Sequence, residues 1–372
     1  MPATATQREQ DRLHLRRALE LAERGRGKVS PNPLVGAVLV RDDEVIGEGF
    51  HAELGGPHAE VAAIADCSSR GGDPAGATLY VTLEPCAHHG RTPPCTEAVL
   101  ASGISRVVIG SEDPSEKASG RGPGILRDEG VEVAFAEGED AAASRLLNQA
   151  FRKHARTGRP LVILKSALSL DGRVATAEGD SRWISGERSR ELVHRWRAEA
   201  DAVCVGIGTA LADDPLLTAR GVEVHRQPTR VVFDSSARLP LDSALAGSTA
   251  DAPLFVIVKS GAAADRVEAL RKAGAAAIAS DGVEAALEEL GRREITSLLL
   301  EGGPTLAGAF LDACEIDELR LFVAPLLIGG SGARPLAGGR GAARIEAAQR
   351  ALAVDFERSG EDVLIRARMR EW

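Results

Sequence analysis

Histidine, glutamate and cysteine recur in the first third of the chain at a spacing that can bind a metal and activate water. His58-Ala59-Glu60 is followed by Glu84-Pro85-Cys86 and then by Pro94-Cys95. One imidazole and two thiolates suit a borderline-soft ion such as Zn²⁺, and three protein ligands leave a fourth position open for water. Bound Zn²⁺ lowers the pKa of that water toward about 7 and so generates hydroxide at neutral pH. The pattern therefore predicts a catalytic zinc site.

Glu60 comes two residues after the histidine, so on a regular helix the two side chains would not share a face. At the first turn of a helix, however, the carboxylate can reach past the metal and move a proton from water to a leaving amine. His-x-Glu followed by two Pro-Cys pairs is typical of zinc nucleobase deaminases. Eight residues separate Cys86 from Cys95 where two are usual. The longer loop carries groups that can contact a substrate.

Other interpretations of these residues stay open at this point. A closed structural zinc site needs a fourth ligand, which His88 or His89 can supply. An RNA-editing deaminase shares the same motif, and a zinc-stabilised scaffold without turnover would also contain it. The remaining cysteines are expected to pack in the cores, and they are Cys67, Cys204 and Cys314.

Glycine-rich segments of the second half are candidates for phosphate binding. No G-x-G-x-x-G follows a strand, which argues against a Rossmann dinucleotide site. Gly206-Ile207-Gly208 fits an ordinary strand-to-helix turn. Glu301-Gly302-Gly303-Pro304-Thr305 follows an expected strand, and Pro304 suits the first turn of a helix. Exposed N–H groups at such a helix start can hold a phosphate, although a plain glycine turn explains the segment equally well.

Apolar periodicity predicts a layered α/β fold for the first half of the chain. Helix-like spacing alternates with short β-rich runs, and the charged residues 41–44 between two such runs favour a hairpin. The expected helices are 12–24, 58–65, 96–102, 124–129 and 139–155. The expected strands are 34–40, 45–50, 77–83, 106–109 and 131–135. Strands that alternate with helices imply helices packed on a sheet.

A polar break that contains a proline, residues 156–160, predicts a boundary between two domains. At roughly 150 residues per domain, a length of 372 also favours two. We therefore expect domains at 1–150 and 157–372. The second domain is expected to be another α/β series with strands at 161–165, 202–206, 229–233, 254–258, 275–279, 297–301 and 318–323. The tail predicts a final antiparallel hairpin of residues 351–356 and 362–367.

Composition and charge exclude several classes of protein. Hydrophobic residues make up 44% and charged residues 27%, a balance that excludes disordered and collagen-like chains. A net charge of −9 without a basic stripe argues against nucleic-acid partners. Neither a long apolar run nor a signal peptide is visible, and five cysteines do not suggest a secreted disulfide scaffold. We expect a cytoplasmic protein with no membrane partner.

Long motifs in both halves resemble one family, the bifunctional deaminase/reductases of riboflavin biosynthesis. The matching segments of the first half are Pro31–Gly36, His58–Val61 and Tyr80–Cys95. The long loop between the two cysteines is that family's own variant. The segments that are similar to the family's reductase domain are Lys165–Arg173, Ser181–Ile184, Gly208–Pro215 and Glu301–Leu306. The resemblance extends from about Leu13 to Leu364.

The resemblance implies two consecutive reactions on a small phosphorylated pyrimidine. A cytidine-deaminase-like α/β/α domain would hydrolyse the 2-amino group from 2,5-diamino-6-ribosylamino-4(3H)-pyrimidinone 5′-phosphate. A dihydrofolate-reductase-like α/β domain would then reduce the ribosyl group with NADPH, which yields 5-amino-6-ribitylamino-uracil 5′-phosphate. The resemblance also implies a homodimer joined through the reductase domains.

The resemblance assigns roles to deaminase residues. His58, Cys86 and Cys95 would bind zinc, and Glu60 would be the proton donor. The substrate contacts would be Asn32, His51, Arg91 and Asp113, and the planar charged fork of Arg91 suits a phosphate. The family often has Asp-Pro-Asn where this chain has Asp113-Pro114-Ser115.

The resemblance also assigns the reductase site. The glycine-rich loop Gly303 to Ala309 is expected to line the NADPH site. The residues expected at that site are Ala167, Trp183, Thr209, Asp213, Ser235, Gly303, Pro304, Thr305, Leu306, Ala307, Gly308 and Ala309. The residues expected to hold the ribosyl phosphate are Ser181, Arg197, Leu217, Arg220 and Glu301. Without the family, Trp183 would be taken as a core residue and each arginine as a solvated charge. No acid or base stands out in this half, so hydride transfer is expected to rely on positioning of the nicotinamide.

Overall fold

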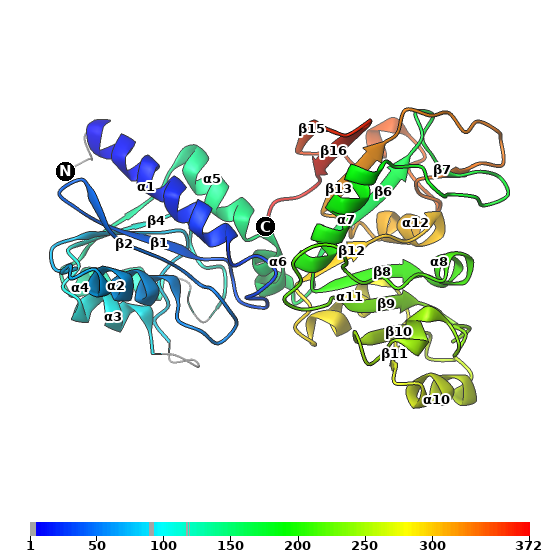
Figure 1. Cartoon of the computed structure of the whole chain (residues 1–372), viewed down its shortest axis with the longest axis horizontal. Coiled ribbons are helices and arrows are strands. Elements are labelled where there is room, and N and C mark those ends of the chain that lie inside the picture. The colour runs from blue at the N-terminus through cyan, green and yellow to red at the C-terminus, as the bar shows by residue number, and fades with distance from the viewer. Residues whose placement is uncertain (1–4, 89–92, 117, 119) are drawn as a thin grey trace. The chain divides into compact units, whose positions relative to one another are not determined.

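The computed structural model describes residues 5–88, 93–116, 118 and 120–372, and the chain divides into two units. The N-terminal unit comprises residues 1–157 together with Trp372, and the C-terminal unit comprises residues 158–371. Each unit is a β-sheet with helices packed against it (Figure 1). This is the α/β organisation that the alternation of strands and helices predicts.

The N-terminal unit has, among its described residues, a five-stranded sheet in the order β2-β1-β3-β4-β5. The strands are β1 (Gly36–Arg41), β2 (Glu44–Phe50), β3 (Thr78–Val81), β4 (Arg106–Ile109) and β5 (Glu132–Phe135). β1 and β2 form the predicted hairpin, and both turn residues, Asp42 and Asp43, have positive φ angles. β3, β4 and β5 run parallel, so their carboxyl ends share one edge of the sheet.

Helices cover both faces of this sheet (Figure 1). They are α1 (Ala5–Glu23), α2 (Ala59–Ser69), α3 (Cys95–Ala101), α4 (Arg121–Asp128), α5 (Gly138–Leu147) and α6 (Gln149–Thr157). Side chains of α2, α3 and α4 pack on one face around Leu79 and Val107, whereas α1 packs on the other face against Val38 and Tyr80. The apolar alternation of the central strands dictates this sandwich, because both of their faces carry buried side chains.

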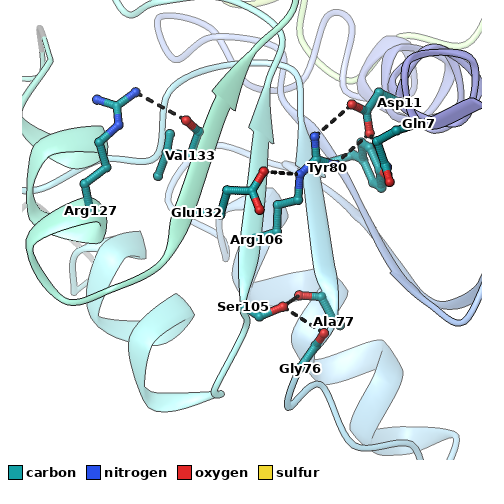
Figure 2. Close-up of polar contacts among 10 residues, drawn as sticks. All are labelled: Gln7, Asp11, Gly76, Ala77, Tyr80, Ser105, Arg106, Arg127, Glu132 and Val133. Carbon is teal, nitrogen blue, oxygen red and sulfur yellow. Dashed lines mark hydrogen bonds and ion pairs between the residues drawn. The ribbon is translucent and has the colours of Figure 1, made fainter. Parts of the chain in front are cut away.

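A partly buried ion pair attaches α1 to the sheet (Figure 2). Arg106 on β4 donates two hydrogen bonds to the carboxylate of Asp11, at 2.7 and 2.9 Å. The hydroxyl of Tyr80 on β3 donates a third to the same carboxylate, at 3.0 Å. Burial opposes ionisation of Asp11, but the hydrogen bonds and charge of Arg106 prevail and hold its pKa below the ordinary value. A fork-to-carboxylate pair of this kind fixes orientation as well as distance.

The predicted helical stretch 139–155 is confirmed, but the structure divides it into two helices that meet at Asn148. The buried Asn148 amide accepts a hydrogen bond from Leu34 N at 2.8 Å and donates one to Leu34 O at 2.9 Å. Both backbone groups precede β1 and would otherwise lack strand partners here. Apolar periodicity could not reveal this break, since it depends on a residue more than a hundred positions away.

The C-terminal unit has, in its described part, a nine-stranded sheet in the order β11-β10-β9-β8-β12-β6-β13-β16-β15. Its strands are β6 (Leu161–Leu168), β8 (Ala202–Gly206), β9 (Thr229–Phe233), β10 (Leu254–Val258), β11 (Ala276–Ala279), β12 (Ser297–Leu300), β13 (Glu318–Val323), β15 (Ala353–Ser359) and β16 (Asp362–Arg368). The predicted strands and the final antiparallel hairpin are confirmed. β7 (Arg173–Ala175) and β14 (Arg334–Pro335), which form a separate small sheet, were not predicted.

Helices flank this second sheet as well. They are α7 (Glu187–Glu199), α8 (Ile207–Asp213), α9 (Ala244–Gly247), α10 (Ala264–Lys272), α11 (Val283–Gly291), α12 (Pro304–Asp312) and the short 3₁₀ turn η1 (Ile345–Ala347). α11 and α12 pack through Leu287 and Phe310 on one face. On the opposite face, Trp196 of α7 stacks on Phe322 of β13 with the ring centres 5.4 Å apart.

Two of the three cysteines that were expected in the cores lie there. Cys67 and Cys204 are fully buried. The prediction for Cys314 is wrong: it is exposed directly after α12, where its φ of 55° places it in a turn. Cysteines occur both in cores and in exposed turns at helix ends. Residue type alone therefore does not show which of the two positions Cys314 occupies.

We predict that Asn148→Ala destabilises the N-terminal unit. The substitution leaves the N–H and C=O of Leu34 without their side-chain partner, which costs roughly 1–3 kcal/mol of unfolding free energy. Circular dichroism during thermal unfolding measures the loss. Gln10→Ala is the control, because it removes an exposed amide hydrogen bond to Asp43 and should change stability by less than about 0.5 kcal/mol. Equal stability of the two variants would contradict the role given to Asn148.

Candidate active sites

The three predicted metal ligands converge in the N-terminal unit. His58 is the N-cap of α2, Cys86 follows β3, and Cys95 is the first residue of α3. Their ligand atoms all lie within 4.8 Å of one another. Nδ1 of His58 is 3.1 Å from Sγ of Cys95 and 3.5 Å from Sγ of Cys86. One ion can contact all three atoms, because zinc lies about 2.0–2.3 Å from nitrogen and sulfur ligands.

The ligand cluster has three members within the described residues, which favours an open site over a closed structural one. His88, one candidate for a fourth ligand, is exposed and does not join the cluster. His89 and the predicted phosphate contact Arg91 lie outside the described residues.

The two thiols differ in their readiness to ionise. Sγ of Cys86 lies 3.5 Å from Sγ of Cys95 and accepts a hydrogen bond from the Cys95 backbone N–H at 3.3 Å. These contacts, with His58 nearby, lower the pKa of Cys86 to about 4, while the contact between the two sulfur atoms and burial raise the pKa of Cys95. A thiolate is the form that binds a metal, so Cys86 is prepared as a ligand before the ion arrives.

Glu60 is the second residue of α2 and is almost completely buried beside the ligands. Burial is the largest effect on this carboxyl group and raises its pKa to about 7. His58 is the N-cap of α2 and Glu60 lies in its first turn, so the two side chains interact although they are two positions apart. The geometry is the one that the sequence requires for a proton carrier beside the metal.

Asn32 and His51 are brought together next to His58. Nδ1 of His51 lies 2.9 Å from the carbonyl oxygen of Pro57, which can only accept a hydrogen bond. Nδ1 therefore carries the proton, and Nε2 accepts from the Asn32 amide at 3.1 Å. The His51 ring also meets the His58 ring edge-on, with the centres 5.5 Å apart. Burial lowers the pKa of His51, so it stays neutral and orients the Asn32 amide.

Asp113 is held in place by Glu84, a residue to which the sequence analysis gave no role. The backbone N–H of Asp113 donates to Oε2 of Glu84 at 3.3 Å, and backbone groups of Gly120 and Gly122 bond the same carboxylate. Oδ1 of Asp113 accepts from Ser115 N at 2.8 Å. Both carboxyl groups are buried, and burial raises both pKa values. The one indication of a role for Glu84 in the sequence was its position directly before the Pro-Cys pair.

Three of the predicted substrate residues of the C-terminal unit, Arg197, Arg220 and Glu301, form a charged cluster just after β12. Arg197 on α7 donates two hydrogen bonds to the carboxylate of Glu301, at 2.7 and 2.9 Å. Arg197 also donates to the backbone oxygen of Thr218, and Arg220 donates to the Thr218 hydroxyl. Leu217, which precedes Thr218 in the chain, is buried and has a φ of 55°. The fork of Arg197 is thus directed at Glu301.

Lys165 joins this cluster, and the sequence analysis gave it no role. Its Nζ is 3.7 Å from Oε2 of Glu301. The strand register explains the contact, because Leu164 on β6 pairs with Leu300 on β12 and the next residues are Lys165 and Glu301. The available signal was chemical: Lys165 is one of only six lysines in a chain with 45 basic residues.

The turn between β12 and α12 has the predicted helix start. Gly303 is the N-cap of α12 and Pro304 opens its first turn. The backbone N–H of Gly303 donates to the hydroxyl of Thr209 on α8 at 3.1 Å, which joins two of the expected cofactor residues. The description of Gly303 to Ala309 as a loop is wrong: residues 304–309 are helical, and Leu306, Ala307 and Gly308 are buried. Proline at the first helical position favours the helix.

The other expected cofactor residues lie on several elements of the C-terminal unit. Ala167 lies on β6, and Ser235 is the second residue after β9. Asp213 ends α8, and its carbonyl oxygen accepts from Arg182 at 3.4 Å. Ser181 and Trp183 lie between β7 and α7. Trp183 is not a core residue: it is 72% exposed, and the Arg190 guanidinium stacks on its ring.

We predict that Cys86→Ala removes the metal, whereas Cys67→Ala does not. Cys86 is within ligand distance of both other members of the cluster, and Cys67 is buried elsewhere on α2. Zinc measured by elemental analysis after dialysis should fall from about one ion per chain to a small fraction of that value in the first variant. A zinc content unchanged by Cys86→Ala would show that these residues are not the metal site.

Comparisons with known proteins agree in both units. Residues 8–111 match the cytidine and deoxycytidylate deaminase zinc-binding region, and residues 160–365 match the RibD C-terminal domain. The combination of a cytidine-deaminase-like fold with a dihydrofolate-reductase-like fold, predicted from the sequence, is thereby confirmed.

Full-length relatives contain the same two regions in one chain. The riboflavin biosynthesis protein RibD of Actinobacillus pleuropneumoniae is 39% identical, with 98% of this chain and 97% of the relative covered. RibD of Aquifex aeolicus is 40% identical, with coverages of 96% and 98%. The structure of Acinetobacter baumannii RibD matches with a TM-score of 0.85 and 38% identity over 97% of this chain and 99% of that one.

A second solved structure carries the activities in its name. It is the diaminohydroxyphosphoribosylaminopyrimidine deaminase/5-amino-6-(5-phosphoribosylamino)uracil reductase of Thermotoga maritima. It matches with a TM-score of 0.86 and 37% identity, over 97% of this chain and 99% of that chain. Both halves, the zinc-ligand geometry and near-complete coverage agree, so this chain belongs to the RibD family.

Proposed function

We propose that the protein catalyses two consecutive steps of riboflavin biosynthesis. The N-terminal unit deaminates 2,5-diamino-6-ribosylamino-4(3H)-pyrimidinone 5′-phosphate, and the C-terminal unit reduces the ribosyl group to give 5-amino-6-ribitylamino-uracil 5′-phosphate. The observation that carries this proposal is the convergence of His58, Cys86 and Cys95 beside the buried carboxyl group of Glu60. That set of donors and that proton carrier are what hydrolytic removal of an amine requires.

The deaminase step uses residues of the N-terminal unit in distinct roles. His58, Cys86 and Cys95 would hold Zn²⁺, which when bound activates water at neutral pH. Glu60 receives the proton of the attacking water at its carboxylate and delivers it to the 2-amino group, which leaves as ammonia. The neutral His51 orients the Asn32 amide toward the pyrimidine, while Glu84 holds the backbone of Asp113 at the other side. Arg91 is proposed as the phosphate contact.

The reductase step uses NADPH, which when bound supplies a hydride. We assign its binding to the turn before α12 and to the strand ends beside it. The proposed cofactor residues are Ala167, Trp183, Thr209, Asp213, Ser235 and 303–309. The proposed contacts with the ribosyl phosphate are Ser181, Arg197, Leu217, Arg220 and Glu301. The hydrogen bond between Gly303 and Thr209 supports this grouping, because it orders the helix start that would face the cofactor phosphates.

The activities divide between domains at 1–150 and 157–372. The deaminase match at 8–111 and the reductase match at 160–365 each fall inside one of these ranges. A location in the cytoplasm suits an NADPH-dependent enzyme whose cysteines are free thiols. No helix in the described part of the chain has the length and apolar character needed to cross a membrane.

A homodimer joined through the reductase domains is the proposed assembly. β15 is an edge strand of the nine-stranded sheet, and Phe356 on it is 81% exposed. Val354, two residues away on the same face of the strand, is also exposed, as are Leu352 and Ile345 nearby in the chain. Apolar groups that gather on an edge strand usually mark an interface, and the small phosphorylated substrate cannot cover them. A second copy of the chain can do so.

We predict that Glu60→Gln abolishes ammonia release and leaves the reductase intact. The amide keeps the size of the side chain but cannot carry the proton, so the rate should fall at least about 10²-fold. One cuvette measures ammonia and NADPH absorbance after addition of the diaminopyrimidinone ribosyl phosphate. The wild type should release ammonia first and then consume NADPH. The variant should do neither with this substrate, but should consume NADPH when given the deaminated compound.

Zinc content and melting temperature are the controls for this variant, and both should equal those of the wild type. Ammonia release by Glu60→Gln at the wild-type rate would disprove the proton-carrier role. A zinc-loaded wild type that produces no ammonia would disprove the proposed deaminase and favour a zinc-stabilised scaffold. An RNA mobility shift at low salt would favour the RNA-editing alternative, which the net charge of −9 opposes.

We predict that Phe356→Asp converts the dimer into a monomer. A charge at an apolar contact between copies must be desolvated, which weakens association by several kcal/mol. Light scattering after size-exclusion chromatography measures the mass. Phe135→Asp is the matched control, because Phe135 is an exposed phenylalanine of the N-terminal unit and should leave the mass unchanged. A dimer that survives Phe356→Asp would place the interface elsewhere.

A further inference from the structure

Arg152 on α6 is a fully buried arginine whose guanidinium bonds two segments that are far apart in the chain. Its Nε donates to the main-chain oxygen of Trp372 at 2.6 Å. Its two terminal nitrogens donate to Glu112, Nη1 to the main-chain oxygen at 2.9 Å and Nη2 to Oε1 at 2.5 Å. Because the guanidinium group is planar and rigid, these bonds fix Trp372 and Glu112 relative to each other.

Trp372 is held by three residues on one face of α6. Gln149, Arg152 and Lys153 follow the helical spacing of three and four positions, which places their side chains on the same side of the helix. The Gln149 amide accepts from Trp372 N at 2.8 Å and donates to its main-chain oxygen at 3.2 Å. The ammonium of the buried Lys153 lies 5.3 Å from the centre of the indole ring, a cation–π contact. Trp372 is therefore an ordered acceptor for Arg152, and all four residues belong to the N-terminal unit.

The other partner of Arg152 is the peptide group that joins Glu112 to Asp113. Its C=O accepts from Arg152 at 2.9 Å, and its N–H donates to Oε2 of Glu84 at 3.3 Å. A peptide group is planar, so bonds at both of its ends fix the plane from which the Cα atom of Asp113 extends. Oδ1 of Asp113 in turn accepts from Ser115 N at 2.8 Å. The carboxyl group of Asp113 therefore has a defined direction at the proposed deaminase site.

An ordinary salt bridge does not explain Arg152. Only 1% of its side chain is exposed, against 50% of that of Glu112, and the burial of a guanidinium group is unfavourable. Arg156, one turn further along α6, lies 3.8 Å from the same carboxylate and remains 41% exposed. A surface arginine can thus neutralise Glu112 without being buried. The buried position of Arg152 adds two bonds to main-chain oxygens, those of Glu112 and Trp372.

We propose that Trp372 and Arg152 are positioning residues for the deaminase. Trp372 anchors the guanidinium of Arg152, and Arg152 anchors the peptide group that directs Asp113 at the pyrimidine. The inference rests on the proposed deaminase function, with Asp113 as a substrate contact, and deepens it. Both residues act through Asp113, so they affect how well the substrate is bound rather than how the proton is transferred.

The first test measures ammonia release by the zinc-loaded full chain that carries Arg152→Lys. Lysine keeps the positive charge but lacks the planar fork, so it cannot hold Glu112 and Trp372 together. KM should rise about tenfold, as expected when one hydrogen bond to a charged group is weakened. The value of kcat should change less than about threefold, because a contact made equally in the ground state and the transition state affects KM alone. NADPH consumption with the deaminated compound should be unchanged.

Arg106→Lys is the matched control for a loss of stability. Arg106 also lies in the N-terminal unit and also donates two hydrogen bonds to one partner, Asp11. It is the first residue of β4, whereas Glu112 follows the other end of that strand. The control should melt at a lower temperature than the wild type, with KM unchanged within about twofold. A merely structural role of Arg152 would likewise lower the melting temperature and leave KM unchanged.

Gln149→Met tests the part of the inference that concerns Trp372 and leaves Arg152 in place. Methionine is close to glutamine in size, but it removes both bonds to the main chain of Trp372. KM should rise about threefold, since the loss of neutral hydrogen bonds has a smaller effect than the loss of charged ones. The variant keeps every buried charge of the site, so it should fold even if Arg152→Lys does not.

Substrate binding to zinc-loaded Glu60→Gln gives a second measurement that does not depend on turnover. Calorimetry should show that Arg152→Lys, added to this variant, weakens binding about tenfold. When Asp113→Asn is also present, the further effect of Arg152→Lys should be less than about twofold, because residues that act through one another are not additive.

The possible outcomes separate the inference from the function beneath it. Wild-type KM in both Arg152→Lys and Gln149→Met would overturn the inference, and so would an equal loss of affinity with and without Asp113→Asn. A KM raised by Arg152→Lys but not by Gln149→Met would overturn the role of Trp372. A zinc-loaded wild type that neither releases ammonia nor binds the substrate would instead disprove the proposed deaminase, and with it the inference.

Discussion

The register of parallel β-strands brings residues that are far apart in the chain side by side, and in the N-terminal unit the shared carboxyl edge of these strands carries the reactive groups. In the N-terminal unit, β3 leads into Glu84 and Cys86, and the parallel β4 leads into Asp113. In the C-terminal unit, the register of β6 with β12 sets Lys165 beside Glu301. Residues that are far apart in the chain are neighbours here because the hydrogen-bond ladder permits no other alignment.

The N-terminal site also contains carboxyl groups that are buried without a full set of hydrogen-bond partners. Glu60 and Glu84 are carboxyl groups in dry surroundings, and burial raises the pKa of each. Among the described residues, Oε1 of Glu84 has no hydrogen-bond partner. By contrast, Asp11 is matched by Arg106 and Tyr80, and its pKa is low. The paired carboxylate of Asp11 is thus ionised, whereas burial favours the protonated form of Glu60 and Glu84 at the N-terminal site.

The sequence predicted helices and strands well where their formation depends on neighbouring residues in the chain. The predicted strands 106–109 and 202–206 have the observed bounds, because short buried runs of Val and Ile are hard to place in any other structure. The start of α2 at the metal motif and of α12 at Pro304 were also foreseeable, since capping and proline chemistry are local. The break in the helical stretch 139–155 was not predicted, because Asn148 is bonded to Leu34, which is distant in the chain. The prediction for Cys314 was wrong, because the burial of a cysteine depends on what surrounds it.

The sequence by itself determined the chemistry of this protein. Residue type sets what a side chain can do, so the chemistry can be predicted from motifs. His-x-Glu with two Pro-Cys pairs indicates groups that bind a metal and carry a proton, and the glycine-proline start of a helix indicates groups that hold a phosphate. Only the tertiary structure decided which groups act together. It oriented Asn32 through His51, supported Asp113 with Glu84, and set Lys165 against the pair of Glu301 and Arg197. Those contacts depend on strand register and on which side chains are buried together. Neither can be predicted from the spacing of residues along the chain.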